Sequence, residues 1–164
     1  MKYVCALIVV EDIAIAKDFY VRVLKQKIAT DFGENVAFEG GFAIHKREHF
    51  QALVENKSIC MGGNDAELYF EHDDLEAVEK ELCAEGVEFV HGTREQPWRQ
   101  KVLRFYDRDR HIVEIGESLE FLAHRLWKEG KSEEEISATT TMAPELVKAA
   151  IASHEDCNVC NNSA

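Results

Sequence analysis

The sequence lacks any apolar run of about 20 residues, the length that a membrane-spanning helix needs. The apolar run from Tyr3 to Val10 is too short for a secretion signal, and the acidic pair Glu11 and Asp12 comes after it in place of a small-residue cleavage site. Without export, the five cysteines are expected to stay reduced in a cytoplasm. The sequence therefore predicts a cytoplasmic protein that does not enter a membrane.

Positive charge is also scarce, with 19 Lys and Arg against 31 Asp and Glu and a formal net charge of −12. A chain this acidic disfavours nucleic acid and anionic membranes as partners, because both require a basic surface. Several catalytic signatures are missing too: the GxSxG elbow, the Walker A loop, the GxGxxG loop and the HExxH motif.

The 164 residues suit one domain with a core and a small appendage. Two halves share the predicted order of strand, helix and three strands, and Asp12 and Asp74 cap the two helices 62 positions apart. The flexible sequence MGGND at 61–65 separates the halves. The first half has predicted strands at 2–10, 27–32, 36–39 and 42–45 and a helix at 13–24; the second has strands at 66–72, 87–91, 101–106 and 111–116 and a helix at 75–84.

One carboxylate stands in the middle of the last predicted strand. Glu114 alternates with Val113 and Ile115, so it points to the opposite face of the strand from these two apolar residues. A carboxylate on so apolar a strand is costly to bury without a partner. Glu114 is therefore expected either in water or facing a cavity where a ligand needs it.

The helix that carries Asp18, Phe19, Tyr20 and Leu24 and the strand ending FYDRDRHIVE at 105–114 resemble the vicinal oxygen chelate superfamily, which includes glyoxalase I, fosfomycin-resistance enzymes, extradiol dioxygenases and bleomycin-binding proteins. The resemblance implies an α+β fold of two βαβββ modules, 1–60 and 66–117, that form curved mixed sheets (half-barrels) within a domain at 1–117. The family usually writes Asp-Pro-Asp-Gly-His in the last turn, where this chain has Arg108 and Arg110.

The resemblance also implies positions for a divalent metal, because metal-using members take ligands from the first and last strand of each module. The matching residues are Cys5, His45, Glu67 and Glu114. Thiolate, imidazole and carboxylates together suit Zn²⁺, Fe²⁺, Ni²⁺ or Mn²⁺. The alternative is that Cys5 is a packed core residue and that the metal has been lost, as in many members.

Without a metal, Glu67 and Glu114 are expected to face one cavity, where two carboxylates raise each other's pKa and one becomes an acid or base near neutral pH. Gln96 and Trp98 lie on a proline-stiffened loop, and Trp98 either stacks on a flat ligand or covers the end of a sheet. Arg104 either holds an anionic ligand, pairs with a glutamate or lies in solvent on an edge strand.

After Glu117 the composition turns to helix formers, and residues 118–153 are predicted as a helical appendage that resembles a helix-turn-helix. Its third helix has one cation, Lys148, so DNA binding is not expected and a cap on the sheet or a dimer contact is favoured. Residues 154–164, with Cys157 and Cys160, are predicted to be a disordered tail.

Two functions fit these features. The first is a lyase, isomerase or transferase that acts next to a carbonyl of a small metabolite, with Glu114 as base or metal ligand and Glu67 assisting. The second is a metal-free protein that binds or sequesters a drug-like or aromatic compound. The appendage also permits a ligand sensor, and the two modules are expected to pair either within one chain or across a homodimer.

Overall fold

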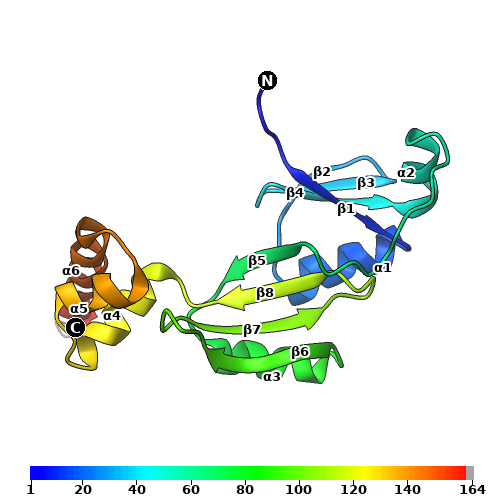
Figure 1. Cartoon of the computed structure of the whole chain (residues 1–164). Coiled ribbons are helices and arrows are strands. Elements are labelled where there is room, and N and C mark those ends of the chain that lie inside the picture. Colours follow the sequence, from blue (N-terminus) through cyan, green and yellow to red (C-terminus); the bar gives the residue numbers. More distant parts are fainter. Residues whose placement is uncertain (162–164) are drawn as a thin grey trace. The chain divides into compact units, whose positions relative to one another are not determined.

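The structure, a computed structural model, describes residues 1–161, with side chains described up to residue 153 (Figure 1). The chain divides into two compact units. The first contains Met1–Leu68, Glu81–Glu88 and Tyr106–Val113, and the second contains Tyr69–Lys80, Phe89–Phe105 and the chain from Glu114 onward.

Helices and strands have the predicted duplicated order. The first half contains β1 (Ala6–Val10), α1 (Ile13–Asp18), the π-helical turn η1 (Phe19–Val23), β2 (Ile28–Asp31), β3 (Asn35–Phe38), β4 (Phe42–Lys46) and α2 (Arg47–Leu53). The second half contains β5 (Glu67–Glu71), α3 (Leu75–Ala84), β6 (Glu88–Glu95), β7 (Lys101–Tyr106) and β8 (Ile112–Gly116). The appendage contains α4 (Leu119–Lys128), α5 (Glu133–Thr140) and α6 (Pro144–Asn161).

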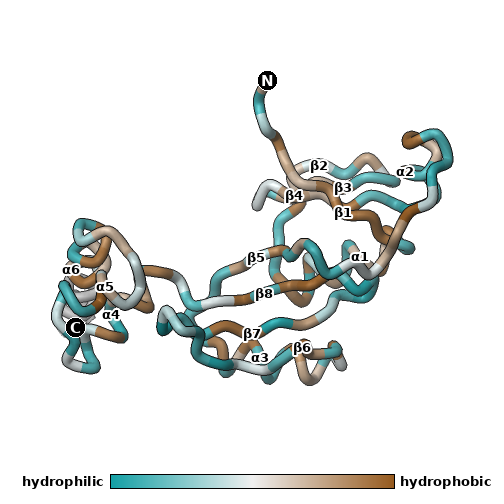
Figure 2. The backbone as a smooth tube through the Cα atoms, in the orientation of Figure 1, coloured by the Kyte–Doolittle hydropathy of each residue, from teal (hydrophilic) through white to brown (hydrophobic). Residues whose placement is uncertain are grey.

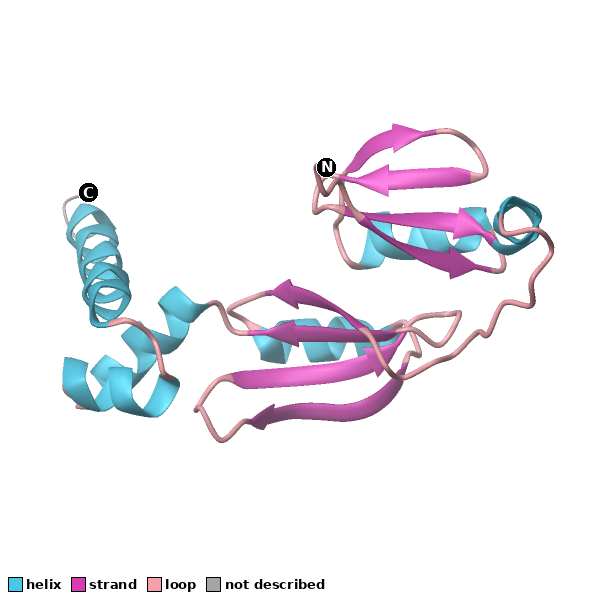
Figure 3. Ribbon diagram, turned by 45° about the horizontal axis from the view of Figure 1, so that its top comes forward, coloured by secondary structure: helices cyan, strands magenta, loops and turns pink. Residues whose placement is uncertain are grey.

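The strand orders confirm the predicted α+β fold with two modules. The first sheet has the order β1-β4-β3-β2 and the second has β5-β8-β7-β6, so each strand of one sheet has a counterpart at the same place in the other (Figure 3). In the first sheet β1 runs parallel to β4, while β3 is antiparallel to both of its neighbours. The first sheet is therefore mixed, and neither sheet closes on itself.

The core of the first sheet is aromatic. Tyr20 of η1 lies against Phe38 and Phe42, whose rings stack on each other with centroids 4.6 Å apart. Tyr20 and Ile44 are fully buried. Because strand side chains alternate, Phe42 and Ile44 face the helix, while His45 faces the other side of the sheet. Figure 2 shows β1 as one of the most apolar segments of the tube.

The first helix begins as predicted and then changes its type. The Asp12 side chain caps α1 by accepting hydrogen bonds from the N–H groups of Ala14 and Ile15. The expected helix at 13–24 gives way after Asp18 to η1, where the Leu24 N–H donates to the Phe19 carbonyl, five residues back. Apolar periodicity missed this change, because a single π turn leaves the spacing of buried residues almost unaltered.

The turn at Asp107–Arg110 is held by one buried carboxylate. Asp107 accepts hydrogen bonds from the backbone N–H groups of Asp109 and His111, from the Tyr20 hydroxyl at 2.8 Å, and from the His111 ring. Burial and the Asp107 charge raise the pKa of Tyr20 well above its usual range. The turn keeps its shape without a proline or a glycine, because Asp107 accepts hydrogen bonds from the backbone N–H groups within it.

The appendage has a core of its own. Leu122 and Leu126 of α4, Ile136 of α5 and Val147 and Ile151 of α6 are buried in one apolar cluster. An ion pair between Glu117 and Arg125 of α4 joins the appendage to the end of the second sheet.

The last helix is longer than predicted. The α6 helix runs through residue 161, so it includes residues 154–161 of the predicted disordered tail; polar residues without Gly or Pro are compatible with a helix exposed to water. The side chains of Cys157 and Cys160 lie outside the described residues. None of the helices within residues 1–161 is long and apolar enough to cross a bilayer.

Candidate functional site

Three ionisable side chains lie together on the second sheet. Glu114 of β8 is 5% exposed and forms an ion pair with Arg104 of the neighbouring strand β7. The Arg104 guanidinium also lies 3.4 Å, Nη1 to Nε2, from the His91 ring on the next strand, β6. The sequence predicted Glu114 and Arg104, and it left open whether they pair. His91 was missed, although its place at the end of the predicted strand 87–91 was a signal.

The pairing explains how an acidic group tolerates burial on an apolar strand. A carboxylate taken out of water loses hydration, and a guanidinium restores much of that loss through its charge and its hydrogen bonds. Val113 and Ile115, on the other face of β8, are buried in the apolar core. The strand thus turns one side to the core and uses the other to hold a charged pair in a largely dry environment.

The loop that carries Gln96 and Trp98 is ordered by hydrogen bonds within the second unit. Trp98 donates through Nε1 to the buried Gln100 side chain (2.9 Å), and Gln100 Nε2 donates to the Tyr69 hydroxyl (3.0 Å) and to the Glu117 carbonyl (2.7 Å). Burial, followed by the Glu71 charge, raises the pKa of Tyr69 to about 12, so this hydroxyl stays protonated.

This network leaves the indole available. Trp98 is 41% exposed while its N–H is fixed, so the ring has a set orientation and an open surface. Gln96 is half-buried, and its Nε2 is buried without a hydrogen-bond partner among the described residues. An exposed flat ring and an unused amide donor are features of a binding loop.

In the first sheet His45 of β4 points away from the apolar core, as Glu114 of β8 does in the second sheet. It is buried, its Nδ1 lies 3.2 Å from the Asn35 side-chain amide nitrogen, and its Nε2 lies 2.8 Å from Nδ1 of His49. Burial, followed by repulsion from His49, lowers the pKa of His45, so the ring is neutral at neutral pH. Asn35 and His49 were not predicted; the register of β3 with β4 places Asn35 beside His45, and α2 supplies His49.

The comparisons with known proteins agree with this fold. A sequence profile described as a glyoxalase-like domain matches residues 3–120, which is well over half of the chain. The chain belongs to the glyoxalase-like family. No curated protein matches the sequence of this glyoxalase-like chain.

Solved structures give the same result. A protein of unknown function from Agrobacterium tumefaciens is 41% identical, with a TM-score of 0.66, and the match covers 73% of this chain and 95% of that one. A glyoxalase/bleomycin resistance protein/dioxygenase from Nocardioides is 16% identical (TM-score 0.57; 71% and 83% covered), and the fosfomycin resistance protein FosX from Listeria monocytogenes is 17% identical (TM-score 0.56; 74% and 98% covered). The last two show likeness of fold.

The metal positions that the family resemblance implies belong to both units: Cys5, His45 and Glu67 lie in the first and Glu114 in the second. Within residues 1–161 no group of three or more His, Cys, Asp or Glu is arranged to hold a metal ion. Ala6 pairs with Phe42, so Cys5 lies roughly four residues, about 13 Å, from His45 along the strands. His45 uses both ring nitrogens within the first unit, and Glu67 is exposed at the start of β5. The predicted set of Cys5, His45, Glu67 and Glu114 therefore stays a prediction.

Proposed function

We propose that this glyoxalase-like chain acts on a small metabolite next to a carbonyl group, as a lyase, isomerase or transferase, with Glu114 as the base. The observation that supports the proposal is the buried Glu114–Arg104 pair beside His91. Ionisable groups in a dry environment are suited to proton transfer, because their charges act there with little screening.

The two paired residues have complementary roles. In this proposal Arg104 donates hydrogen bonds to the carbonyl oxygen of the substrate, where negative charge develops when a proton leaves the neighbouring carbon. Glu114 accepts that proton and returns it at the end of the reaction, so the residue is unchanged overall. A ligand that takes over part of Arg104 weakens its hold on Glu114 and makes this carboxylate a stronger base.

The test is proton exchange in deuterium oxide, followed by NMR. A panel of small 2-oxo acids and hydroxy ketones, with pyruvate as its simplest member, is incubated with the full chain, and the signal of the proton next to the carbonyl is followed. Glu114→Gln is expected to lower the exchange rate by about 10²-fold or more, the scale of a lost general base. Glu120→Gln, at an exposed glutamate on α4, is the matched control. Equal exchange by the wild type and Glu114→Gln contradicts the proposal.

A metal-free binding function is the second candidate, and the geometry of Trp98 favours it. Its indole is exposed and held by Gln100, as in a loop that stacks on an aromatic or drug-like compound. Under this alternative, saturation-transfer NMR detects binding of aromatic compounds without any proton exchange, and Trp98→Ala abolishes that binding. Under the first proposal Trp98→Ala weakens binding and Glu114→Gln removes turnover.

A metal analysis addresses the predicted ligand set. The untagged chain is purified without chelator and its content of Zn, Ni, Fe and Mn is measured, then compared with Cys5→Ala and Glu114→Gln. Stoichiometric metal that both substitutions remove supports the set of Cys5, His45, Glu67 and Glu114. Metal bound without dependence on either residue contradicts it.

We further propose a homodimer. The strands β1 and β5 lie at the edges of their sheets, so each has one side without a partner in its own sheet. The β1 edge also exposes Leu7, and Tyr3 and Val4 just before it are exposed apolar residues. Light scattering of the full chain is expected to give twice the monomer mass, and Leu7→Lys is expected to shift it toward the monomer. A monomeric wild type contradicts this proposal.

A further inference from the structure

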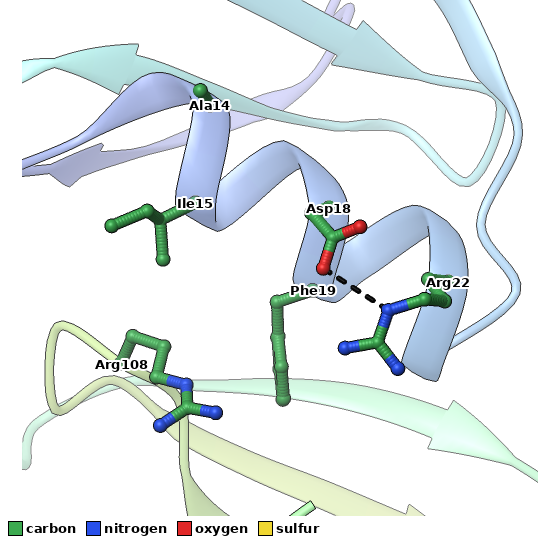
Figure 4. A pocket seen from close by; sticks show the side chains of 6 residues that line it. All are labelled: Ala14, Ile15, Asp18, Phe19, Arg22 and Arg108. Atoms are coloured by element: carbon green, nitrogen blue, oxygen red, sulfur yellow. Dashed lines mark hydrogen bonds and ion pairs between the residues drawn. The ribbon is translucent and has the colours of Figure 1, made fainter.

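The first unit contains a cavity of about 660 Å³ beside its first helix. Its lining is Ala14, Ile15, Asp18, Phe19, Arg22 and Arg108, which come from α1, η1 and the turn that Asp107 holds (Figure 4). A volume of this size falls in the range of small-molecule sites. None of its residues belongs to the Arg104–Glu114 pair, so the cavity is separate from the site of the proposed function.

One wall of the cavity is apolar and partly exposed to solvent. Ile15 is 55% exposed, although its neighbour Ala16 is buried against the sheet. Phe19 is buried and presents part of its ring to the cavity, and Ala14 completes this wall. An exposed isoleucine beside an aromatic ring offers a surface for the flat apolar part of a ligand.

Two guanidinium groups also line the cavity, and they differ in how many hydrogen bonds and ion pairs they form. Arg22 bonds to Asp18 at 3.1 Å and to both oxygens of Glu85 at 2.6 and 2.9 Å. Arg108 forms no ion pair in the part of the chain that the structure describes, and its guanidinium donates one long hydrogen bond, 3.4 Å, to the Glu85 carbonyl. Arg108 therefore has donors left for a carboxylate, which a guanidinium binds with two parallel hydrogen bonds.

Two further features show that this region is unusual. Arg110, two residues later in the same turn, has φ +72°, a conformation that favours glycine, yet it lies over the Tyr106 ring and pairs with Glu88. The turn thus has two arginines, and one of them adopts a backbone conformation that favours glycine. In addition, Phe19 and Arg22 belong to η1, and π-helical turns are rare and frequently occur at functional sites.

We propose that this cavity binds an organic carboxylate with a flat apolar body. Arg108 holds the carboxylate, and Ile15, Phe19 and Ala14 contact the apolar body, while Arg22 stays paired with Asp18 and Glu85. With a net charge of −12, the protein surface repels anions in general. Arg108, whose guanidinium donates one long hydrogen bond to the Glu85 carbonyl, provides a local positive charge that can attract an anion into the cavity.

The test uses 2-naphthoate as the probe and the full chain as the protein, with binding followed by the fluorescence of the probe. Two half-probes accompany it: 2-naphthalenemethanol, which lacks the charge, and acetate, which lacks the ring. Arg108→Gln is the test variant, and Arg94→Gln, at an exposed arginine of β6, is the matched control. Ile15→Ser, at a half-exposed position where folding is preserved, tests the apolar wall.

Wild type and Arg94→Gln are expected to bind 2-naphthoate with equal affinity. Arg108→Gln is expected to weaken binding about tenfold or more, the scale of one lost charge-assisted contact. Ile15→Ser is expected to bind 2-naphthoate several-fold more weakly than the wild type. The wild type is expected to bind each half-probe several-fold more weakly than 2-naphthoate. The proposal is overturned if the wild type does not bind 2-naphthoate, if Arg108→Gln binds as well as Arg94→Gln, or if 2-naphthalenemethanol binds as tightly as the acid. None of these outcomes depends on proton exchange by Glu114.

Discussion

The two modules have the same strand order but different chemistry on the face opposite the apolar core. The strands β4 and β8 each carry a buried polar residue on that face, and the neighbouring strand supplies its partner. In the first sheet these residues are His45 and Asn35, which are neutral. In the second sheet they are Glu114 and Arg104, which are charged. Both sheets therefore bury a polar pair on the face opposite the apolar core, but only the pair of the second sheet is charged.

The comparison indicates that the shared strand order places polar residues of neighbouring strands side by side in both sheets, while the residue types at these positions differ. A neutral imidazole with both nitrogens hydrogen-bonded is a stable structural element, whereas a buried ion pair costs desolvation and is retained where charge is useful. We therefore expect the second sheet to contain the reactive site and the first sheet to contain a structural counterpart.

The largest expected effect comes from breaking the charged pair. Arg104→Leu leaves the Glu114 carboxylate buried beside an apolar residue, and urea unfolding is expected to show a loss of about 3–5 kcal/mol. Asn35→Ala, at the corresponding partner position of the first sheet, removes a neutral hydrogen bond and is expected to cost about 1 kcal/mol. The double variant Arg104→Leu, Glu114→Leu should recover most of the loss. Equal costs for Arg104→Leu and Asn35→Ala would remove the distinction between the modules.

The next effect concerns the helix that comes after the last strand of each module. Glu117, 2% exposed, accepts two hydrogen bonds from Arg125 of α4 at 3.0 and 2.9 Å, and this pair fastens the appendage to the second sheet. Arg125→Met is expected to cost about 2–3 kcal/mol. After the first sheet, Arg47 of α2 pairs with Glu11 at the surface, and Arg47→Met is expected to cost less than about 1 kcal/mol. Thermal unfolding of both variants measures the contrast.

A smaller effect concerns the turn that precedes each of these strands. Gly41 has φ +81° before β4, and Arg110 has φ +72° before β8. Gly41→Ala is expected to cost about 1 kcal/mol, because a side chain is strained in this conformation. Arg110→Gly relieves such strain but loses the contacts with Tyr106 and Glu88, so a change within about 0.5 kcal/mol is expected. A large loss in Arg110→Gly would show that the arginine shapes the turn.

The smallest effects are those of pH, and two histidines are expected to give opposite slopes. Burial, followed by repulsion from His49, lowers the pKa of His45 in the folded chain. Below about pH 6.5 the unfolded chain therefore binds the proton more readily, and stability decreases as the pH decreases. Burial also opposes the charge of His111, but the Asp107 hydrogen bond and charge outweigh it and raise the pKa. The stability from His111 is therefore fully present below about 6.5 and is lost as the pH rises through the raised value.

Urea unfolding between about pH 5 and 8 separates the two histidines, because their pKa values are shifted in opposite directions from the ordinary histidine value in that range. His45→Gln is expected to flatten the acid side of the profile, and His111→Gln is expected to flatten the alkaline side. A profile in which His45→Gln steepens the loss of stability at low pH contradicts the neutral state assigned to His45.

The fold could be predicted from the sequence because its signals are local and repeated. Asp12 and Asp74 start the helices, apolar runs give the strands, and the repeat implies two sheets of one design. The same signals fail at detail. They did not show the π turn at Phe19, because periodicity does not resolve one extra residue, and they did not show α6 beyond residue 153, because a polar helix resembles a polar tail.

The site was predicted only in part, because contacts between side chains of neighbouring strands depend on the strand register. Glu114 and Arg104 could be named from their strands, but their pairing depends on the alignment of β7 with β8. Cys5 and His45 point to one face of the first sheet, yet the register separates them along it. His91, Asn35 and His49 carry no motif, so only coordinates identify them.

The carboxylate of Asp107 has a consequence for how this family can diversify. Because Asp107 accepts hydrogen bonds from the backbone N–H groups of Asp109 and His111, a substitution at position 108 leaves the hydrogen bonds that hold the turn in place. Each new side chain at position 108 alters the wall of the cavity near Phe19. A substitution at position 108 can thus change which ligand the cavity prefers while the turn keeps its hydrogen bonds.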